Sequence, residues 1–312
     1  MRVIVAGLGV QGHKRRKFAG GDYVASVDPV NPDADFKRLQ EVPLADYDAV
    51  LACIPDAPKF ELLSYCIDNA KHVLVEKPLW VESARQIQDL EERARARNVF
   101  CYTAYNHRFE PHFVRMRDLI ASGQLGRIYS CRMFYGNGTA RLVRDSAWRD
   151  QGAGVVPDLA SHLLDTCRFW FSDVADNFAV SSARGFENRA PDHAVILSDN
   201  ARMRIELEMT LLMWRNHFTC DILAEKGSAH IRSLCKWGPS TFTHRTRVLP
   251  SGRPPEHEVT LVQDDPTWEL EYAYFKHACE SGARTNLSDD LWLHTALARL
   301  GKDAISKMGA FA

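Results

Sequence analysis

The sequence lacks the features that would place this protein in a membrane or on a nucleic acid. No apolar run in its 312 residues approaches the roughly 20 residues that a membrane-spanning helix needs. Lys and Arg total 39 against 40 Asp and Glu, so no charge excess favours a nucleic acid or an anionic membrane as partner. The hydrophobic share of 46% is typical of a globular chain and excludes a disordered one.

Cysteine pairs and a cleavable signal are also missing. The eight cysteines lie far apart with no Cys-x-x-Cys, which argues against a disulfide framework and against a zinc site. Residues 2–6 have the pattern of a strand instead of a signal peptide. We therefore expect reduced thiols and a cytoplasmic protein.

Short apolar runs alternate with helical patterns over the first third of the chain. Strands are predicted at 2–6, 23–27, 48–54, 71–75 and 99–104. Helical spacing covers 58–69 and 83–98, and a further helix is expected from His13. This alternation predicts an α/β domain with a parallel sheet and right-handed crossovers.

The pattern changes near residue 123, and the strongest later signal is strict alternation over 202–211. Weaker alternation follows at 217–224 and 257–262, with a hairpin turn predicted at 225–228 and helices at 267–280 and 289–307. We expect an α+β domain with a mostly antiparallel sheet, and domains at 1–121 and 122–312. The alternation at 202–211 also suggests a sheet face covered by a partner subunit, hence a homodimer or homotetramer.

A glycine-rich loop follows the first predicted strand and opens a helix. Gly7 allows a tight turn, Gly9 lets a pyrophosphate approach the main chain, and Gly12 lets helix and strand pack closely. Asp28, at the end of the second strand, is placed to accept hydrogen bonds from ribose hydroxyls. The alternative is a glycine-rich turn of another α/β protein. The cofactor-binding residues predicted here are Gly7, Gly9, Val10, Gln11, Gly12 and Asp28.

Asp28 also bears on the choice between NAD and NADP. Its carboxylate repels a 2′-phosphate, and residues 29–31 supply no cation to offset it, so NAD is favoured. NADP stays possible because a basic side chain from the run 14–17 could reach a phosphate. We interpret that run as a solvated helix face.

Lys77 follows the fourth predicted strand, at the edge where ligands of parallel sheets bind. An ammonium group beside an oxidised nicotinamide is disfavoured by the neighbouring positive charge and by desolvation. Lys77 could therefore exchange a proton near neutral pH. The alternative is an ordinary surface lysine.

A helix that begins near Pro157 is predicted to present Asp158 and His162 on one face. An Asp and a His four residues apart resemble a metal pair, but no third ligand follows at a telling spacing, so no metal is predicted. The other alternative is a capping Asp with a histidine in the core.

Four segments together resemble the Gfo/Idh/MocA family, the relatives of glucose–fructose oxidoreductase and inositol dehydrogenase. They are the glycine loop, Glu76-Lys77-Pro78, the segment 105–109 and the Asp158/His162 helix. The resemblance implies an N-terminal Rossmann domain, doubly wound, followed by a larger domain with an open sheet that often forms the oligomer interface. It also implies that the C-terminal helices can pack back on the first domain.

The resemblance implies roles for particular residues. Lys77 and His162 would be the proton-transfer residues, and Asp158 would position the substrate and support the pair. Arg108 would join these three in substrate binding. The further residues that the resemblance places at the cofactor are Ile54, Pro55, Glu76, Lys77, Asn106, Trp148 and Arg149.

The activity implied is hydride transfer between NAD(P) and a carbinol or ketone carbon of a sugar, cyclitol or nucleotide-linked sugar. Two alternatives stay open: a non-enzymatic NAD-binding regulator on the same fold, and a reductase of a non-sugar carbonyl. A regulator would need the glycine loop but would have no use for Lys77, Asp158 and His162.

The sequence departs from the family pattern in three places. The stretch from Asp28 to Asp48 is too short for the usual second crossover helix. Asp56 and Phe60 stand where relatives often carry Asn and a later His. The usual glycine-rich triplet is Gly-Ala-Gly at residues 152–154.

Overall fold

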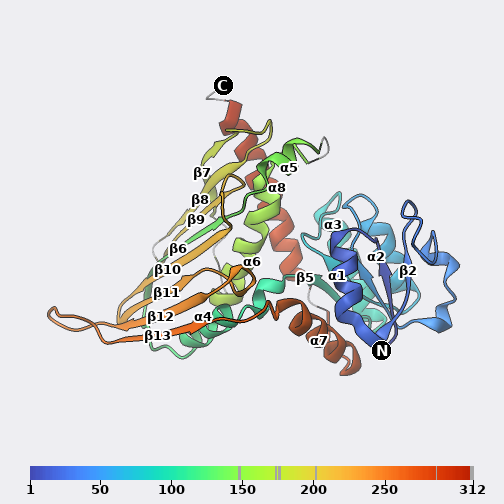
Figure 1. Ribbon diagram of the computed structural model, residues 1–312, viewed down its shortest axis with the longest axis horizontal. Coiled ribbons are helices and arrows are strands. Elements are labelled where there is room, and N and C mark those ends of the chain that lie inside the picture. Colours follow the sequence, from blue (N-terminus) through green and yellow to red (C-terminus); the bar gives the residue numbers. More distant parts are fainter. Residues whose placement is uncertain (147–148, 173, 175–176, 201, 286, 310–312) are drawn as a thin grey trace. The chain divides into compact units, whose positions relative to one another are not determined.

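The protein consists of two compact units, each built on its own sheet (Figure 1). The computed structural model describes residues 1–146, 149–172, 174, 177–200, 202–285 and 287–309. The first unit comprises Met1–Asn106 and Thr267–Thr295, and the second comprises His107–Pro266 and Ala296–Ala312. This division differs from the boundary predicted after residue 121, because helix α4 (Pro111–Ala121) belongs to the second unit.

The first unit contains a five-stranded parallel sheet in the order β2-β1-β3-β4-β5. Its strands are β1 (Val3–Ala6), β2 (Tyr23–Val27), β3 (Ala49–Ala52), β4 (His72–Glu76) and β5 (Cys101–Ala104). Because all five strands are parallel, their carboxyl ends share one edge of the sheet. The predicted parallel α/β arrangement is confirmed.

Helices connect most of these strands. They are α1 (Val10–Ala19), α2 (Lys59–Asp68) and α3 (Ala84–Ala96), and α7 (Thr267–Glu280) packs against α1. Between β2 and β3 the chain forms only the short 3-10 turns Leu39–Glu41 and Leu44–Asp46. The expected loss of the second crossover helix is therefore confirmed.

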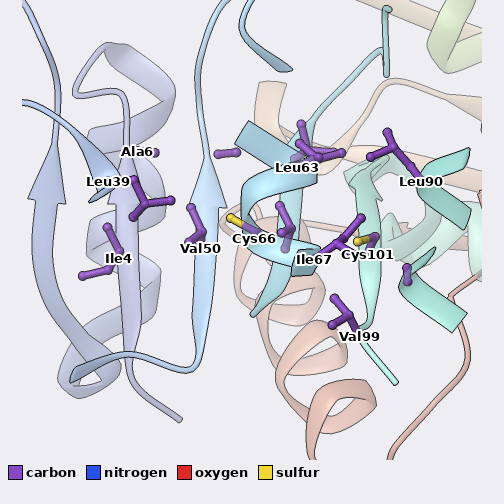
Figure 2. Packing of buried hydrophobic residues seen from close by; sticks show 14 of the residues in the cluster. Ile4, Ala6, Leu39, Val50, Leu63, Cys66, Ile67, Leu90, Val99 and Cys101 are labelled. Atoms are coloured by element: carbon purple, nitrogen blue, oxygen red, sulfur yellow. The ribbon is translucent and has the colours of Figure 1, made fainter. Parts of the chain in front are cut away.

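One face of this sheet is covered by α2 and α3, whose buried side chains form the core shown in Figure 2. Ile4 and Val50 point from the strands, and Leu63, Ile67 and Leu90 point from the helices; all five are inaccessible to solvent. Burying each such side chain contributes about 1.5–3 kcal/mol, so this cluster holds the carboxyl edge of the sheet in place.

The second unit is organised around an eight-stranded sheet in the order β13-β12-β11-β10-β6-β9-β8-β7. Its strands are β6 (Ile128–Gly136), β7 (Ala179–Arg184), β8 (His193–Asp199), β9 (Arg204–Thr210), β10 (His217–Ala224), β11 (Gly227–Arg232), β12 (Ser240–Thr246) and β13 (Glu256–Leu261). Within this second sheet, the β6–β9 pair is parallel and the other pairs of described strands are antiparallel. The predicted α+β domain with a mostly antiparallel sheet is confirmed. The hairpin turn predicted at 225–228 is found between β10 and β11, but it comprises only residues 225 and 226, because 227 and 228 pair within β11.

The apolar face of this sheet is covered within the chain itself. Ile205, Leu207 and Met209 of β9 are at most 1% exposed. Helix α6 (Ser161–Phe171) and the part of α8 (Ser288–Gly309) after Thr295 lie along this face (Figure 1). Our interpretation that a partner subunit covers the alternating strand is therefore wrong, and the homo-oligomer stays a prediction without that support.

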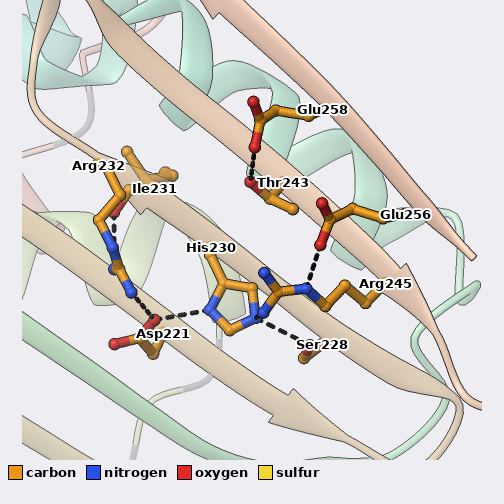
Figure 3. A network of polar contacts seen from close by, with 9 residues as sticks. All are labelled: Asp221, Ser228, His230, Ile231, Arg232, Thr243, Arg245, Glu256 and Glu258. Atoms are coloured by element: carbon orange, nitrogen blue, oxygen red, sulfur yellow. Dashed lines mark hydrogen bonds and ion pairs between the residues drawn. The ribbon is translucent and has the colours of Figure 1, made fainter. Parts of the chain in front are cut away.

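The opposite face of the sheet carries charged and polar side chains. On β9 these are Arg204, Glu206 and Glu208. Farther along the sheet, His230 Nδ1 lies 2.6 Å from Asp221 Oδ1, and Arg232 also binds Asp221 (Figure 3). The alternation of β9 therefore reflects a sheet packed on helices on one side and covered by polar side chains on the other.

The structure can be compared with two expectations from the sequence, that the cysteines are reduced and that no helix spans a membrane. All eight cysteines are free thiols. Within the described residues, the helices are too short or too polar to span a bilayer.

Candidate functional site

The glycine loop adopts a turn that other residues would not fit. Gly7 has φ +89°, and a Cβ built on it would lie 2.4 Å from the carbonyl oxygen of Cys53. A Cβ on Gly12 would lie 1.9 Å from the carbonyl oxygen of Gly7. Both distances are too short for real atoms, so the two glycines let the loop pack against the end of β3 and against itself.

The start of α1 is open in the way an anion site requires. Gly9 is the N-cap, no described side chain caps the helix, and nothing lies within 4 Å of a Cβ built on Gly9. Val10 is 75% exposed. The first N–H groups of a helix have no partners inside it and favour a negative charge. The loop therefore fits the pyrophosphate of a dinucleotide.

Asp28 lies beside this loop and organises it. Its Oδ2 accepts the Leu8 N–H at 2.8 Å, and its Oδ1 accepts the N–H groups of Val30 and Asn31 at 2.9 Å each. Burial favours the neutral acid, but the hydrogen bonds from Asn31, Leu8 and Val30 outweigh it and hold the pKa of Asp28 below its usual value. The carboxylate is therefore ionised at the position predicted for the adenosine ribose.

A cation close to Asp28 was missed by the sequence analysis. Lys37 Nζ donates to the carbonyl oxygen of Asn31 at 2.8 Å and interacts electrostatically with Asp28. The 28–36 turn folds back so that Phe36 pairs with Val27, which brings Lys37 to this place. Only residues 29–31 and the basic run 14–17 had been considered as sources of a cation near Asp28.

The basic run of α1 contains a buried member, so its interpretation as a solvated face is wrong for Arg15. The Arg15 Nε donates to Glu76 Oε1 at 2.8 Å, and Nη1 lies 2.7 Å from Glu271 Oε2. The guanidinium of Arg15 lies over the Trp268 ring, with Cζ 4.3 Å from the ring centroid. Arg15 therefore joins α1, the end of β4 and α7. Glu76, predicted at the cofactor, is bound to Arg15 through Oε1.

The remaining predicted residues of the first unit lie after strand ends. Ile54 and Pro55 follow β3, with Ile54 Cγ2 3.4 Å from the Cβ position of Gly7. Lys77 follows β4 directly and is half-buried. Asn106 follows β5, and its amide donates to Thr267 Oγ1 at 2.8 Å. The carboxyl edge of the sheet thus gathers these residues with the glycine loop.

In the second unit, Asp158 lies in a π-helical turn, Val156–Ala160, which runs into α6. Arg149 Nη2 lies 3.9 Å from Asp158 Oδ2, a loose ion pair. Trp148 lies outside the described residues. π-turns occur preferentially at functional sites, because the extra residue redirects side chains relative to a regular helix.

His162 is on α6 and is packed among groups that can exchange protons. Its ring stacks on His107, with centroids 4.1 Å apart, and Tyr135 lies 6.0 Å away. Lys236 Nζ is 3.3 Å from His107 Nε2 and 3.4 Å from the Tyr135 hydroxyl. His107, Tyr135 and Lys236 were not predicted as site residues. His107 alone had a signal, because it belongs to the 105–109 motif.

Arg108, predicted to bind substrate, is paired within its own unit. Its Nε donates to Asp165 Oδ2 at 2.9 Å, and its Nη2 binds Asp165 Oδ1. Asp165 is buried on α6. This bidentate pair anchors the 106–109 turn on the helix that carries His162.

The predicted residues therefore form two groups. The glycine loop, Asp28, Ile54, Pro55, Glu76, Lys77 and Asn106 belong to the first unit, and Arg108, Arg149, Asp158 and His162 belong to the second. Among the described residues, no three His, Cys, Asp or Glu side chains are arranged to bind a metal ion.

Sequence models of one family match both units. The model described as "Oxidoreductase family, NAD-binding Rossmann fold" matches residues 4–105. The model of the GFO/IDH/MocA C-terminal domain matches residues 113–230.

Curated relatives and solved structures are similar to this chain. A myo-inositol 2-dehydrogenase of Thermotoga maritima is 33% identical over 127 residues, 39% of this chain and 35% of that protein. Inositol 2-dehydrogenase 2 of Mycolicibacterium vanbaalenii is 25% identical over 74% of this chain and 72% of its own length. The first relatives match over 34% to 58% of their lengths.

A levoglucosan dehydrogenase solved with NADH has a TM-score of 0.83 at 16% identity, covering 99% of this chain and 98% of that one. This similarity shows that the two chains share a fold.

Proposed function

This chain belongs to the GFO/IDH/MocA family of oxidoreductases with an NAD-binding Rossmann domain, and on that premise we propose that it transfers a hydride between a nicotinamide cofactor and a carbinol or ketone carbon. We propose a sugar, a cyclitol or a nucleotide-linked sugar as its substrate. The observation that carries the proposal is the uncapped, open start of α1 on the same sheet edge as Lys77. Relatives named for inositol and levoglucosan support the substrate class.

The residues of the first unit would hold the cofactor. The N–H groups at the start of α1 would bind the pyrophosphate, and Asp28 would accept the ribose hydroxyls with the acceptor capacity left on its two oxygens. The ionised Asp28 favours NAD over NADP. Ile54, Pro55, Glu76 and Asn106 would line the path toward the nicotinamide.

Bound nicotinamide supplies a carbon that accepts or gives the hydride. In the oxidising direction, Lys77 Nζ or the His162 ring would take the proton of the substrate hydroxyl while the hydride leaves the carbinol carbon that bears this hydroxyl. In the reducing direction, the same groups give the proton to the developing alkoxide. Asp158 would orient the substrate, Arg108 would join in substrate binding, and Trp148 and Arg149 would contribute to cofactor binding. The proposal requires Lys77 and His162 to approach one substrate.

A binding and turnover screen tests this function. The protein is incubated with NADH or NAD plus myo-inositol, levoglucosan and a set of ketoses and nucleotide sugars, while unfolding temperature and absorbance at the NADH band are followed. A ligand that binds only the folded protein raises the unfolding temperature. We expect NADH alone to stabilise the protein and at least one carbohydrate to change the NADH absorbance.

Two variants extend the screen to the proposed residues. Lys77→Met and His162→Asn should each lower kcat by about 10²–10⁴-fold with NADH still bound, because general acid–base groups contribute that much. Lys71→Met is the control, since Lys71 binds backbone carbonyls at the other end of β4. NADH binding without turnover of any carbonyl or alcohol would favour the non-enzymatic regulator, and full turnover in both variants would refute the assigned roles.

We further propose a cytoplasmic homodimer or homotetramer. Eight free thiols agree with a reducing compartment. Light scattering at assay concentration checks the oligomer, and a monomer would refute it.

A further inference from the structure

The buried ammonium group of Lys59 binds the backbone of the segment that carries Lys77. Lys59, the first residue of α2, is 2% exposed. Its Nζ donates to the carbonyl oxygen of Glu76 at 2.9 Å and to that of Pro78 at 2.6 Å. These two carbonyls immediately precede and follow Lys77. The third contact is an ion pair with Asp56 Oδ1 at 2.7 Å.

This arrangement uses the whole donor capacity of the group. An ammonium has three N–H donors, and three oxygens lie within hydrogen-bond reach of Lys59 Nζ. Burial lowers the pKa of Lys59, and the neighbouring carboxylates of Asp56 and Glu76 oppose that effect. A buried charge costs stability unless it is paired, so an apolar side chain would serve packing alone at least as well. The feature that an apolar residue cannot reproduce is the pair of bonds around Lys77.

The same segment is held from another direction. Arg15 binds the Glu76 side chain through Nε at 2.8 Å and Nη2 at 2.7 Å. Glu76 is thus fixed by its backbone through Lys59 and by its side chain through Arg15. The strand end therefore has two buried cationic supports, one from α2 and one from α1.

We propose that Lys59 is a positioning residue that fixes the backbone on both sides of Lys77 and so sets the direction of the Lys77 amine. The inference rests on the proposed function, in which Lys77 moves a proton at the substrate oxygen. Proton transfer depends on near-attack geometry, and a misplacement of about 1 Å can cost about 100-fold in rate. Asp56 supports Lys59 through the ion pair at 2.7 Å.

The chain offers a matched control at the opposite end of the same strand. Lys71 precedes β4, and its Nζ donates to the carbonyl oxygens of Leu44 at 2.6 Å and Tyr47 at 2.8 Å. Lys59 and Lys71 thus bind the backbone by the same chemistry, and only Lys59 does so beside Lys77. Both Lys59→Met and Lys71→Met would lower the stability of the fold, whereas only Lys59→Met would disturb the position of Lys77.

A double-mutant cycle on kcat tests the inference. It uses NADH and the compound with the highest turnover in the screen. Lys59→Met should lower kcat about 10- to 100-fold while the NADH Kd changes less than about threefold. Lys59→Met/Lys77→Met should be no slower than Lys77→Met, because the positioned amine is already absent. Lys71→Met should keep wild-type kcat. Multiplicative losses in the double variant, or wild-type kcat in Lys59→Met, would overturn the proposal.

A second measurement needs no substrate. The lysines are reductively methylated with ¹³C-formaldehyde, and the Lys77 resonance is assigned by its absence in Lys77→Arg. Lys59→Met should shift or broaden this resonance, and Lys71→Met should leave it in place. An unchanged Lys77 resonance in Lys59→Met would overturn the positioning role even if no substrate is found.

The outcomes separate this inference from the proposed function. Full turnover in Lys77→Met would refute the catalytic assignment, and the Lys77 resonance would still report whether Lys59 orients it. Asp56→Asn is the milder variant if Lys59→Met does not fold, since it keeps both carbonyl bonds of Lys59. It should lower kcat about two- to fivefold and shift the Lys77 resonance less. If Lys59→Met does not fold and Asp56→Asn changes neither kcat nor the Lys77 resonance, the proposal is overturned.

Discussion

Replacing Asp28 by serine should change which dinucleotide the protein prefers. Asp28 accepts three backbone N–H groups and is ionised, so its substitution removes both the ribose acceptor and the charge that repels a 2′-phosphate. Hydrogen bonds to a charged group contribute about 1.5–3 kcal/mol each, which predicts an NADH Kd higher by about 10- to 100-fold. Lys37, already beside Asn31, would then face the phosphate of NADPH. The ratio of the NADPH Kd to the NADH Kd should fall by about 100-fold or more.

Fluorescence titration of NADH and NADPH measures this ratio. Asp35→Asn is the control, because Asp35 also accepts a backbone N–H, from Ser26 at 2.8 Å, and its pKa is also lowered by Ser26. The control should lose some stability and keep the wild-type cofactor preference. If Asp28→Ser kept the wild-type ratio, the reasoning that places the ribose at Asp28 would be refuted.

Three further predictions concern the glycine loop and two carboxylates. Gly9→Ala should keep the wild-type unfolding temperature but bind NADH more than about 10-fold more weakly. Gly12→Ala should have both a lower unfolding temperature and weaker NADH binding. Calorimetry measures the unfolding temperatures, and titration measures NADH binding. Burial raises the pKa of Glu110 against the opposing bonds from Cys235, so the folded state prefers its neutral form and loses stability as pH rises. Glu110→Gln should therefore match or exceed the wild-type unfolding temperature near pH 8 and lose that advantage near pH 4. Burial acts to raise the pKa of Asp22, but the stronger combined effect of Lys276 and Tyr272 lowers it, so its contribution is present above about pH 4 and disappears in acid. Urea titrations should find the deficit of Asp22→Asn at neutral pH and not at about pH 2.

Several elements could be predicted from their local sequence pattern, including β10, whose alternation is weak. The predicted bounds of β2 (Tyr23–Val27), β10 (His217–Ala224) and α7 (Thr267–Glu280) agree with the structure. In each, apolar spacing and neighbouring turn residues point to the same element. The missing helix before β3 followed from chain length alone.

Buried charges could not be predicted in this way. The run that contains Arg15 was interpreted as a solvated helix face, and Lys59 was not singled out, because charged side chains are usually exposed. Their burial depends on partners far along the chain, Glu76 and Glu271 for Arg15 and the carbonyls beside Lys77 for Lys59. A pattern of period 3.6 marks an apolar face and carries no information on such pairs.

The surroundings of His162 were likewise hidden, because they combine three distant segments. His107 precedes α4, Tyr135 lies on β6, and Lys236 follows β11. The π-turn at Asp158 had no sequence signal that distinguishes it from the regular helix we predicted. The coverage of β9 was misassigned because alternation reveals a buried face without revealing what buries it.

The most direct measurement is to follow a deuterium label from the nicotinamide. The protein is given NADH deuterated at C4 of the nicotinamide on each face in turn, together with the best ketone from the screen, and the product is analysed by mass spectrometry and NMR. Hydride transfer predicts that one of the two labelled cofactors delivers its deuterium to the new carbinol carbon, one atom for each NADH consumed. Product without label from either cofactor, or label released to water, would contradict the function proposed for this protein.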